Sequence, residues 1–278
     1  MKMILKMYFL LLLIFHLAVE LYAINPNRDY IRTPDSLGLD FESLNLHTYD
    51  GYDIHTWIYA ANPEKDNCKI LLLAYPDAGN MSYFVYHSAI LASHGYTVVT
   101  FDYRGFGKSS DFEIDQDSLY YNEFAIDLSA VAEVIYEKFP NKEIGIWALS
   151  MGTIIAVKAM ESLKGKVQFL ISEGFVSDPS LIVERTFEQK DKVLILPENG
   201  NAYFNSLKKI DIPILIFTAT LDQITTYDDA LNVKKQVNER CEIVLFEGEH
   251  LGGFNFGDGD WGAYYVGEIN RFLEGVFV

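Results

Sequence analysis

A serine stands at the junction of an apolar strand and a helix-forming segment. Ser150 is the centre of Ala148-Leu149-Ser150-Met151-Gly152, which follows a strand predicted for residues 144–149 and precedes a helix predicted for residues 151–163. A nucleophile in so tight a turn needs small neighbours, which the alanine and the glycine of this pentapeptide provide, and the turn exposes its hydroxyl at the positive end of the helix. This context favours a nucleophilic serine over the alternative, a serine that caps a helix.

A serine nucleophile requires a general base, and a histidine commonly fills that role. Of the six histidines, His250 is the one that follows Ser150, and it lies in a loop just past the last predicted strand, residues 242–246. Loops at the carboxyl ends of parallel strands reach the ends of neighbouring strands. We therefore predict that His250 is the general base and that the earlier histidines of the folded body have structural roles.

An imidazole base needs a carboxylate that orients it. Asp222 follows the strand predicted for residues 213–218 by a short turn, and Glu173 directly follows the preceding predicted strand. Chain order and placement at the strand end favour Asp222 as the orienting acid, with Glu173 as the competing candidate. Asp228 and Asp229 lie one turn into the next predicted helix, where negative charge near the N-terminus is favourable.

Two backbone amides are expected to form an oxyanion hole, since developing negative charge needs fixed donors. One belongs to Met151, the residue after the nucleophile. The other should come from the loop after the strand predicted for residues 70–74, which is Tyr75-Pro76-Asp77-Ala78-Gly79-Asn80. Asp77 is the candidate second donor through its main-chain amide, and Ala78 is the alternative. The carboxylate of Asp77 opposes the build-up of negative charge unless it points away from the site.

Strands that alternate with helical stretches must position these residues. After an opening hairpin about Asp50-Gly51, apolar strands alternate with amphipathic helical segments. This pattern predicts an α/β fold with a mostly parallel central sheet and helices on both faces, whose sites lie at the carboxyl ends of the strands. Besides the elements named above, we predict strands at residues 43–49, 54–59 and 96–101, helices at residues 83–93, 226–238 and 261–273, and a helix that Ser118 caps and Pro140 stops.

The body of the chain is predicted to be one domain, because no repeat, linker or low-complexity tract interrupts residues 24–278. Residues from about 173 to 211 are poorly periodic, and a connection of that length inside a compact domain is typically a functional lid. Cys68 and Cys241 begin separate predicted strands that lie far apart in such a sheet, so we predict two buried free thiols.

The N-terminus has the pattern of a secretory signal peptide over residues 1–23. Lys2 and Lys6 precede an apolar run at residues 7–19, and Leu21-Tyr22-Ala23 offers a cleavage point. The run is shorter than the roughly 20 residues of a membrane-spanning helix. We therefore predict a secreted or periplasmic protein without a stable membrane partner, and the alternative is an uncleaved N-terminal anchor.

Charge and motifs argue against several kinds of binding partner. The net charge of −17 repels phosphate backbones, which argues against nucleic acid as a partner. Gly107-Lys108-Ser109 lacks the first glycine of a phosphate-binding loop, whose position is taken by Asp102. The chemistry of a serine, a histidine and a carboxylate requires no metal and no organic cofactor.

These motifs resemble the α/β-hydrolase superfamily, and within it the small-lid serine hydrolases. Their oxyanion strip commonly has the sequence His-Gly-Asn-Ala-Gly-Asn, which residues 75–80 match with three changes. Residues 102–109 are similar to the stretch after the fourth strand of such enzymes. The resemblance runs from about Phe41 to the C-terminus, implies the α/β-hydrolase fold, and carries the acid and the histidine of the family onto Asp222 and His250.

The chain departs from this family pattern at two places. Tyr75-Pro76 replaces the usual His-Gly, and proline has no amide hydrogen to offer an oxyanion. Thr225-Thr226 replaces an apolar residue and proline shortly after the acid. Both changes bear on catalytic efficiency more than on the fold.

The function predicted from these residues is hydrolysis of a carboxylic ester or related acyl bond in a small-molecule substrate, through an acyl-enzyme. A serine peptidase acting on short peptides is the alternative chemistry, since the same triad cleaves amides. A non-catalytic binding protein that kept the fold is the alternative from another class, motivated by Tyr75-Pro76. The sequence leaves the acyl group, the leaving group and the oligomeric state open.

Overall fold

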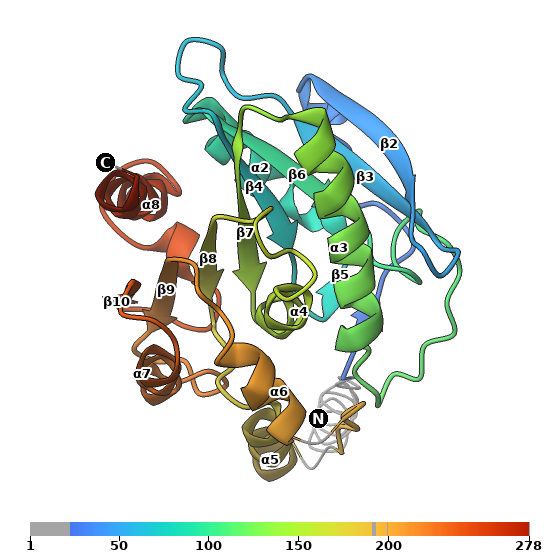
Figure 1. Ribbon diagram of the computed structural model, residues 1–278, viewed down its shortest axis with the longest axis vertical. Coiled ribbons are helices and arrows are strands. Elements are labelled where there is room, and N and C mark those ends of the chain that lie inside the picture. The colour runs from blue at the N-terminus through green and yellow to red at the C-terminus, as the bar shows by residue number, and fades with distance from the viewer. Residues whose placement is uncertain (1–22, 191–192, 199, 278) are drawn as a thin grey trace, which may run out of the picture.

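The computed structural model describes residues 23–190, 193–198 and 200–277. The predicted signal peptide lies outside these residues, except for Ala23. Figure 1 shows a central twisted sheet with helices on its two faces. Across the described ranges, no helix is long and apolar enough to cross a membrane.

Eight strands form the central sheet in the order β10-β9-β8-β7-β4-β6-β3-β2. Neighbouring strands are parallel from β10 to β6, and the predicted hairpin of β2 and β3 adds an antiparallel edge. A short separate sheet pairs β1 with β5. The strands are β1 (Asn25–Pro26), β2 (Phe41–His47), β3 (Asp53–Tyr59), β4 (Lys69–Ala74), β5 (Ala78–Gly79), β6 (Tyr96–Phe101), β7 (Glu143–Leu149), β8 (Phe169–Glu173), β9 (Ile214–Ala219) and β10 (Cys241–Phe246).

Helices cover both faces of the sheet because the apolar parallel strands must be buried on both sides. One face carries α3 and α4, which pack against each other (Figure 1). On the other face, Trp147 of β7 contacts α2 through the ring of His87 and α8 through a hydrogen bond to Tyr265. The helices are α2 (Val85–Ser93), α3 (Tyr121–Lys138), α4 (Met151–Ala159), α5 (Pro179–Lys190), α6 (Gly200–Leu207), α7 (Tyr227–Gln236) and α8 (Ala263–Val276), with 3₁₀ helices at Asp35–Leu37, Met81–Phe84 and Gly253–Asn255.

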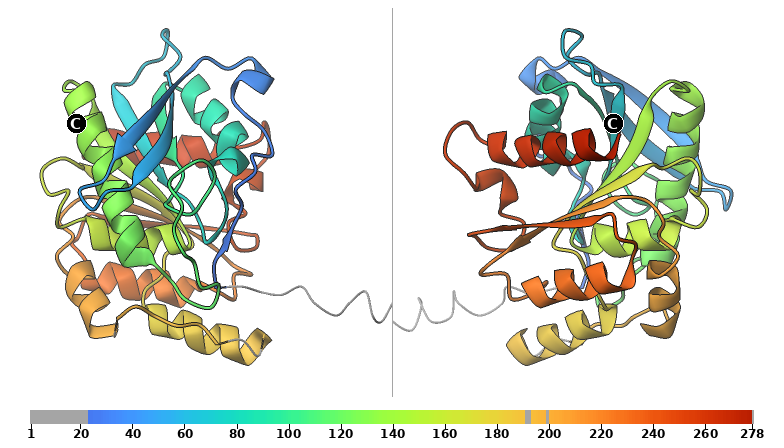
Figure 2. Two further views of the ribbon diagram at one scale, coloured as in Figure 1. Left: turned by 90° about the vertical axis from the view of Figure 1, so that its right-hand side faces the viewer. Right: turned by 60° about the vertical axis from the view of Figure 1, so that its left-hand side comes forward.

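The connection between β8 and β9 contains two helices, α5 and α6. Figures 1 and 2 show both at the end of the sheet toward which the strand arrows point. α6 packs against α4 and α5. The predicted lid therefore lies at the edge of the sheet where parallel strands carry their sites.

The predicted helix cap at Ser118 is wrong. α3 begins at Tyr121 and has no side-chain cap. The Ser118 hydroxyl donates to the Asp115 carboxylate at 3.3 Å, and the Ser118 backbone forms an isolated bridge with Ile195. The serine belongs to a turn before the helix because its hydroxyl is engaged locally.

The prediction for the two cysteines is right about their pairing and half wrong about their burial. Both are free thiols, and β7, β8 and β9 lie between the strands that they precede or begin. Cys241 is buried, but Cys68 is exposed, with a left-handed backbone at a φ of 59°. Cys68 lies in the turn before β4 rather than in the strand, so its side chain faces solvent.

Candidate active site

Ser150 occupies the tight turn between β7 and α4. Its φ of 51° and ψ of −117° are unusual for a residue with a side chain, and such strain costs about 1–3 kcal/mol. A Cβ atom at Gly152 would lie 1.9 Å from the carbonyl oxygen of Ala74, so only glycine lets α4 begin this close to β4. On the other side, the Ser150 N–H donates to the carbonyl oxygen of Glu173 at 3.0 Å. The neighbouring strands β4 and β8 thus fix the turn.

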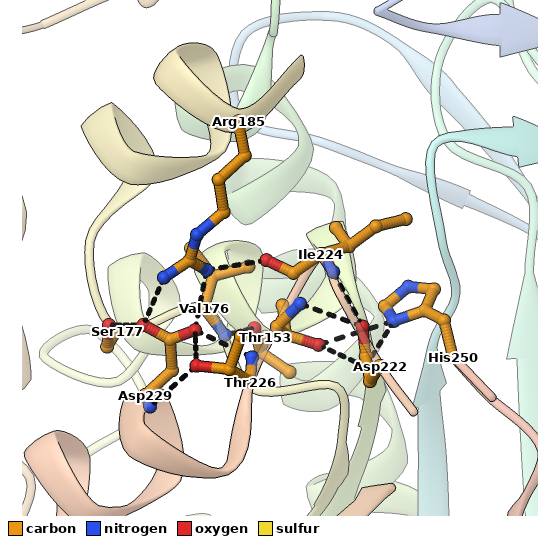
Figure 3. Close-up of polar contacts among 10 residues, drawn as sticks. Thr153, Val176, Ser177, Arg185, Asp222, Ile224, Thr226, Asp229 and His250 are labelled. Atoms are coloured by element: carbon orange, nitrogen blue, oxygen red, sulfur yellow. Dashed lines mark hydrogen bonds and ion pairs between the residues drawn. The ribbon is translucent and has the colours of Figure 1, made fainter. Parts of the chain in front are cut away.

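The predicted base and acid meet the serine in one line of contacts. His250 Nε2 lies 3.0 Å from Ser150 Oγ, and His250 Nδ1 lies 2.7 Å from Asp222 Oδ2. Figure 3 shows the imidazole beside the Asp222 carboxylate. Asp222 is 7% exposed. Burial favours the neutral acid, but hydrogen bonds from His250 and Thr225 outweigh it and hold the pKa of Asp222 below its ordinary value.

The turn after Asp222 fastens its carboxylate in place. The N–H groups of Ile224 and Thr225 donate to Oδ1 at 2.8 and 2.9 Å, and the Thr225 hydroxyl donates to Oδ2 at 2.7 Å. The same hydroxyl lies 3.3 Å from Nδ1 of His250. Thr225, a departure from the family pattern, is therefore a polar support of the acid, and sequence reasoning missed this role. An Asp followed three residues later by a threonine is the signal that would have indicated it.

A partly buried ion pair joins the lid to this turn. Arg185 of α5 donates to the Asp229 carboxylate at 2.6 Å and to the Ile224 carbonyl oxygen at 2.7 Å (Figure 3). Asp229 also completes a capping box with Thr226 at the start of α7, and it accepts the Ser177 hydroxyl at 2.7 Å. From the sequence, the only role predicted for Asp229 is a favourable negative charge near the N-terminus of the helix. Its further contacts link the lid to the segment that carries Asp222.

Glu173, the competing acid, does not take the orienting position. It is the last residue of β8 and is 3% exposed, and its Oε1 accepts the N–H of Gly253 at 2.7 Å. Tyr265 hydrogen-bonds the same carboxyl. Burial raises the pKa of Glu173 to about 7, although Gly253, His250 and Tyr265 oppose this rise. The side chain therefore holds the loop that follows His250, while Asp222 contacts the imidazole.

Glu173→Gln should remove a pH-dependent loss of stability. Because the folded pKa of about 7 exceeds the ordinary 4.5, the folded protein keeps a proton that the unfolded chain has released, and stability falls as pH rises between these values. The expected loss is about 3 kcal/mol. Urea unfolding between pH 4 and pH 8 should show this fall in the wild type and a flatter profile in the variant. Parallel profiles would contradict the assignment.

The two predicted oxyanion donors belong to separate elements. Met151 is the first residue of α4, so its amide lies at the helix N-terminus directly after Ser150. Asp77 is half-buried in the loop after β4, and its carbonyl oxygen accepts the N–H of Asn25 at 2.8 Å. Ala78, the alternative donor, is exposed and begins β5. Which of the two loop amides faces an oxyanion stays a prediction.

Tyr75 has a structural reason to replace the usual histidine. Its ring is fully buried, 4.3 Å from the ring of Tyr103. The Tyr75 hydroxyl accepts the Tyr103 N–H, and the Tyr103 hydroxyl donates to the Tyr75 carbonyl oxygen, both at 3.1 Å. The first residue of the oxyanion loop is thus bonded to the turn after β6.

Among the described residues, no three potential ligands come together to hold a metal ion.

Comparisons with known proteins agree with this architecture. Residues 79–186 match a family model described as serine aminopeptidase, S33. The uncharacterised protein YfhR of Escherichia coli O157:H7 is 23% identical over 225 residues, which are 79% of this chain and 76% of that protein. An uncharacterised membrane protein of Saccharomyces cerevisiae is 35% identical over 83 residues, and the match spans 30% of this chain and only 28% of that protein.

Among solved structures, an esterase of Pyrococcus furiosus has a TM-score of 0.71 at 17% sequence identity, and the superposition covers 91% of this chain and 100% of that one. The chain therefore has the α/β-hydrolase fold, and its residues 79–186 are similar to a family of serine hydrolases.

Proposed function

We propose that this protein is a serine hydrolase that cleaves a carboxylic ester, or a related acyl bond, through an acyl-enzyme. The observation that carries the proposal is the line of contacts from Ser150 through His250 to Asp222. A serine hydroxyl 3.0 Å from an imidazole, which a buried carboxylate orients from the other side, has the arrangement that activates a nucleophile.

The roles follow from the positions of the three side chains. Ser150 Oγ attacks the carbonyl carbon while its proton passes to Nε2 of His250, and the amides of Met151 and of Asp77 or Ala78 stabilise the oxyanion. His250 then returns the proton to the leaving alcohol. Water attacks the acyl-enzyme by the same steps in reverse and releases the carboxylic acid. Asp222 stabilises the imidazolium that forms in each half of the reaction.

A peptidase is the second candidate function, because residues 79–186 match a model described as serine aminopeptidase. The experiment that separates the candidates is a substrate panel on the purified protein. It pairs p-nitrophenyl esters of two-, four- and eight-carbon acids with aminoacyl p-nitroanilides. We expect turnover of esters in preference to anilides. Faster cleavage of the anilides would favour the peptidase. No turnover, together with no labelling by a fluorophosphonate, would favour a binding protein.

Gly174→Ala should lower kcat by about 100-fold without unfolding the chain, because small displacements of reacting groups are costly. A Cβ atom there would lie 2.8 Å from Cε1 of His250, so the ring must move. Gly165→Ala is the matched control, since it has a similar positive φ but no atom within 4 Å of the added Cβ. Esterase kinetics and thermal unfolding of both variants provide the measurement. An equal loss of activity in both would assign the effect to backbone strain alone.

We also propose that the protein is exported and that residues 1–23 are removed. The proposal is supported by the positive charges and short apolar run at the N-terminus. N-terminal sequencing of protein recovered from the medium or the periplasm should find Ile24 first. Recovery of the intact N-terminus in a membrane fraction would favour the anchored alternative.

A further inference from the structure

The first described residues of the chain run beside the oxyanion loop. We call residues 24–31 the N-terminal strap. Its strand β1 pairs in parallel with β5 of the loop, as Asn25 opposite Ala78 and Pro26 opposite Gly79. The N–H of Asn25 donates to the Asp77 carbonyl oxygen at 2.8 Å, and the N–H of Asn27 donates to the Gly79 carbonyl oxygen at 2.9 Å.

Side chains reinforce this pairing at the end of the loop. Asn80 is fully buried, and its Nδ2 donates to the carbonyl oxygens of Asn27 and Asp29, both at 2.8 Å. Tyr30 of the strap donates its hydroxyl to the buried Asp102 carboxylate, which also accepts the N–H of Met81 at 3.0 Å. The strap therefore holds the loop from its middle to its end.

The opposite side of the strap is fixed to the body of the protein. Ile24 is buried, and its N–H donates to the Gln116 carbonyl oxygen at 3.2 Å. The Asn27 carbonyl oxygen also accepts the N–H of Gly107 at 2.9 Å. The strap thus lies between the oxyanion loop and the segment after β6, with backbone hydrogen bonds to each.

Among the residues that the structure describes, β1 is the strand that pairs with the loop at this point. The pairing of β4 with β7 ends at Ala74, so residues 75–79 leave the central sheet before they reach the strap. In a trans peptide the C=O of one residue and the N–H of the next point in opposite directions. The bond from Asn25 to the Asp77 carbonyl oxygen therefore fixes the direction of the Ala78 N–H, away from the strap.

We infer that the N-terminal strap is a positioning element of the oxyanion hole. It sets the orientation of the peptide between Asp77 and Ala78, and so of the Ala78 N–H, through Asn25, and it holds the end of the loop through Asn80. The inference rests on the proposed function, since an oxyanion forms only if Ser150 attacks an acyl group. Fixed amides stabilise a transition state because they need no reorganisation during the reaction.

A substitution at an exposed residue of β1 tests this inference. Asn25→Pro removes the N–H that donates to Asp77 and leaves the rest of the strap in place, whereas Asn25→Ala keeps that N–H and is the matched control. Two measurements are made on the purified mature protein that begins at Ile24: hydrogen exchange of residues 75–80, and ester kinetics. We expect faster exchange of the loop and a kcat about 10- to 100-fold lower in the proline variant, with KM little changed, since loss of a whole donor costs about 100- to 1,000-fold. The alanine variant should match the wild type in both.

The outcomes separate the strap from the proposed function. Unchanged loop exchange in Asn25→Pro, or faster exchange with an unchanged kcat, overturns the positioning role. A third outcome is possible: the loop exchanges faster in Asn25→Pro, but the wild type neither turns over esters nor reacts with a fluorophosphonate. That result keeps the strap as a structural support of the loop and overturns the proposed esterase. If Asn25→Pro exchanges rapidly in β7 as well, it has not folded. Tyr30→Phe then replaces it, and unchanged exchange around Met81 in that variant overturns the inference.

Discussion

Ser150→Ala should abolish labelling by a fluorophosphonate and lower turnover by about 10⁶-fold, the size of the loss seen when a triad serine is removed. The expected effect is large because the Ser150 hydroxyl lies 3.0 Å from the imidazole, and alanine offers no atom to attack a carbonyl. The strained backbone at φ 51° persists in the variant, so stability should change little. In-gel labelling and ester turnover, measured beside a thermal unfolding curve, check all three expectations.

Ser93→Ala is the matched control for that experiment. Ser93 is an exposed serine at the end of α2, and its hydroxyl bonds the carbonyl oxygen of Ile90 in its own helix. This variant should label and turn over as the wild type does. If Ser150→Ala labels as strongly as Ser93→Ala, then Ser150 is not the nucleophile.

Asp222→Asn should lower turnover by up to about 10⁴-fold, because an amide in place of the carboxylate favours the wrong imidazole tautomer. The carboxylate accepts His250 Nδ1 at 2.7 Å and has three further donors from Ile224 and Thr225, so its geometry should persist in the variant. Kinetics of Asp222→Asn and Glu173→Gln, measured side by side at pH 8, provide the test.

The expected difference between these two acids is large. Glu173 bonds the loop after His250 at Gly253, whereas the imidazole bonds Asp222, so the neutral variant of Glu173 should keep most of the activity. If Glu173→Gln loses nearly all turnover while Asp222→Asn keeps most of it, then Glu173 orients the histidine and the two assigned roles are reversed.

The fold class and the meeting of distant residues were predictable because they depend on patterns that extend over many residues. Apolar strands alternating with helices predicted the parallel sheet, and the structure confirms it. Loops at the carboxyl ends of parallel strands share one edge of the sheet, and this rule predicted that Ser150, Asp222 and His250 lie together. In the chain, Ser150 is 100 residues and Asp222 is 28 residues away from His250.

The features that sequence reasoning missed depend on contacts of single residues. β1 is a two-residue strand that contains a proline, so the N-terminal strap has no periodicity to reveal it. Thr225 was treated as a departure from a family pattern, although its hydroxyl bonds Asp222. Such roles follow from the tertiary structure, which no local pattern encodes.

The proposed chemistry predicts a covalent intermediate on one named atom. An ester substrate added to the wild type and quenched in acid should leave an acyl group on the protein, and peptide mapping by mass spectrometry should place it on the peptide that contains Ser150. The acyl group should accumulate in His250→Ala more slowly or not at all, because the base that activates Ser150 is missing. An acyl group on a different residue, or ester turnover with no covalent intermediate at Ser150 under rapid quench, would contradict the proposed mechanism.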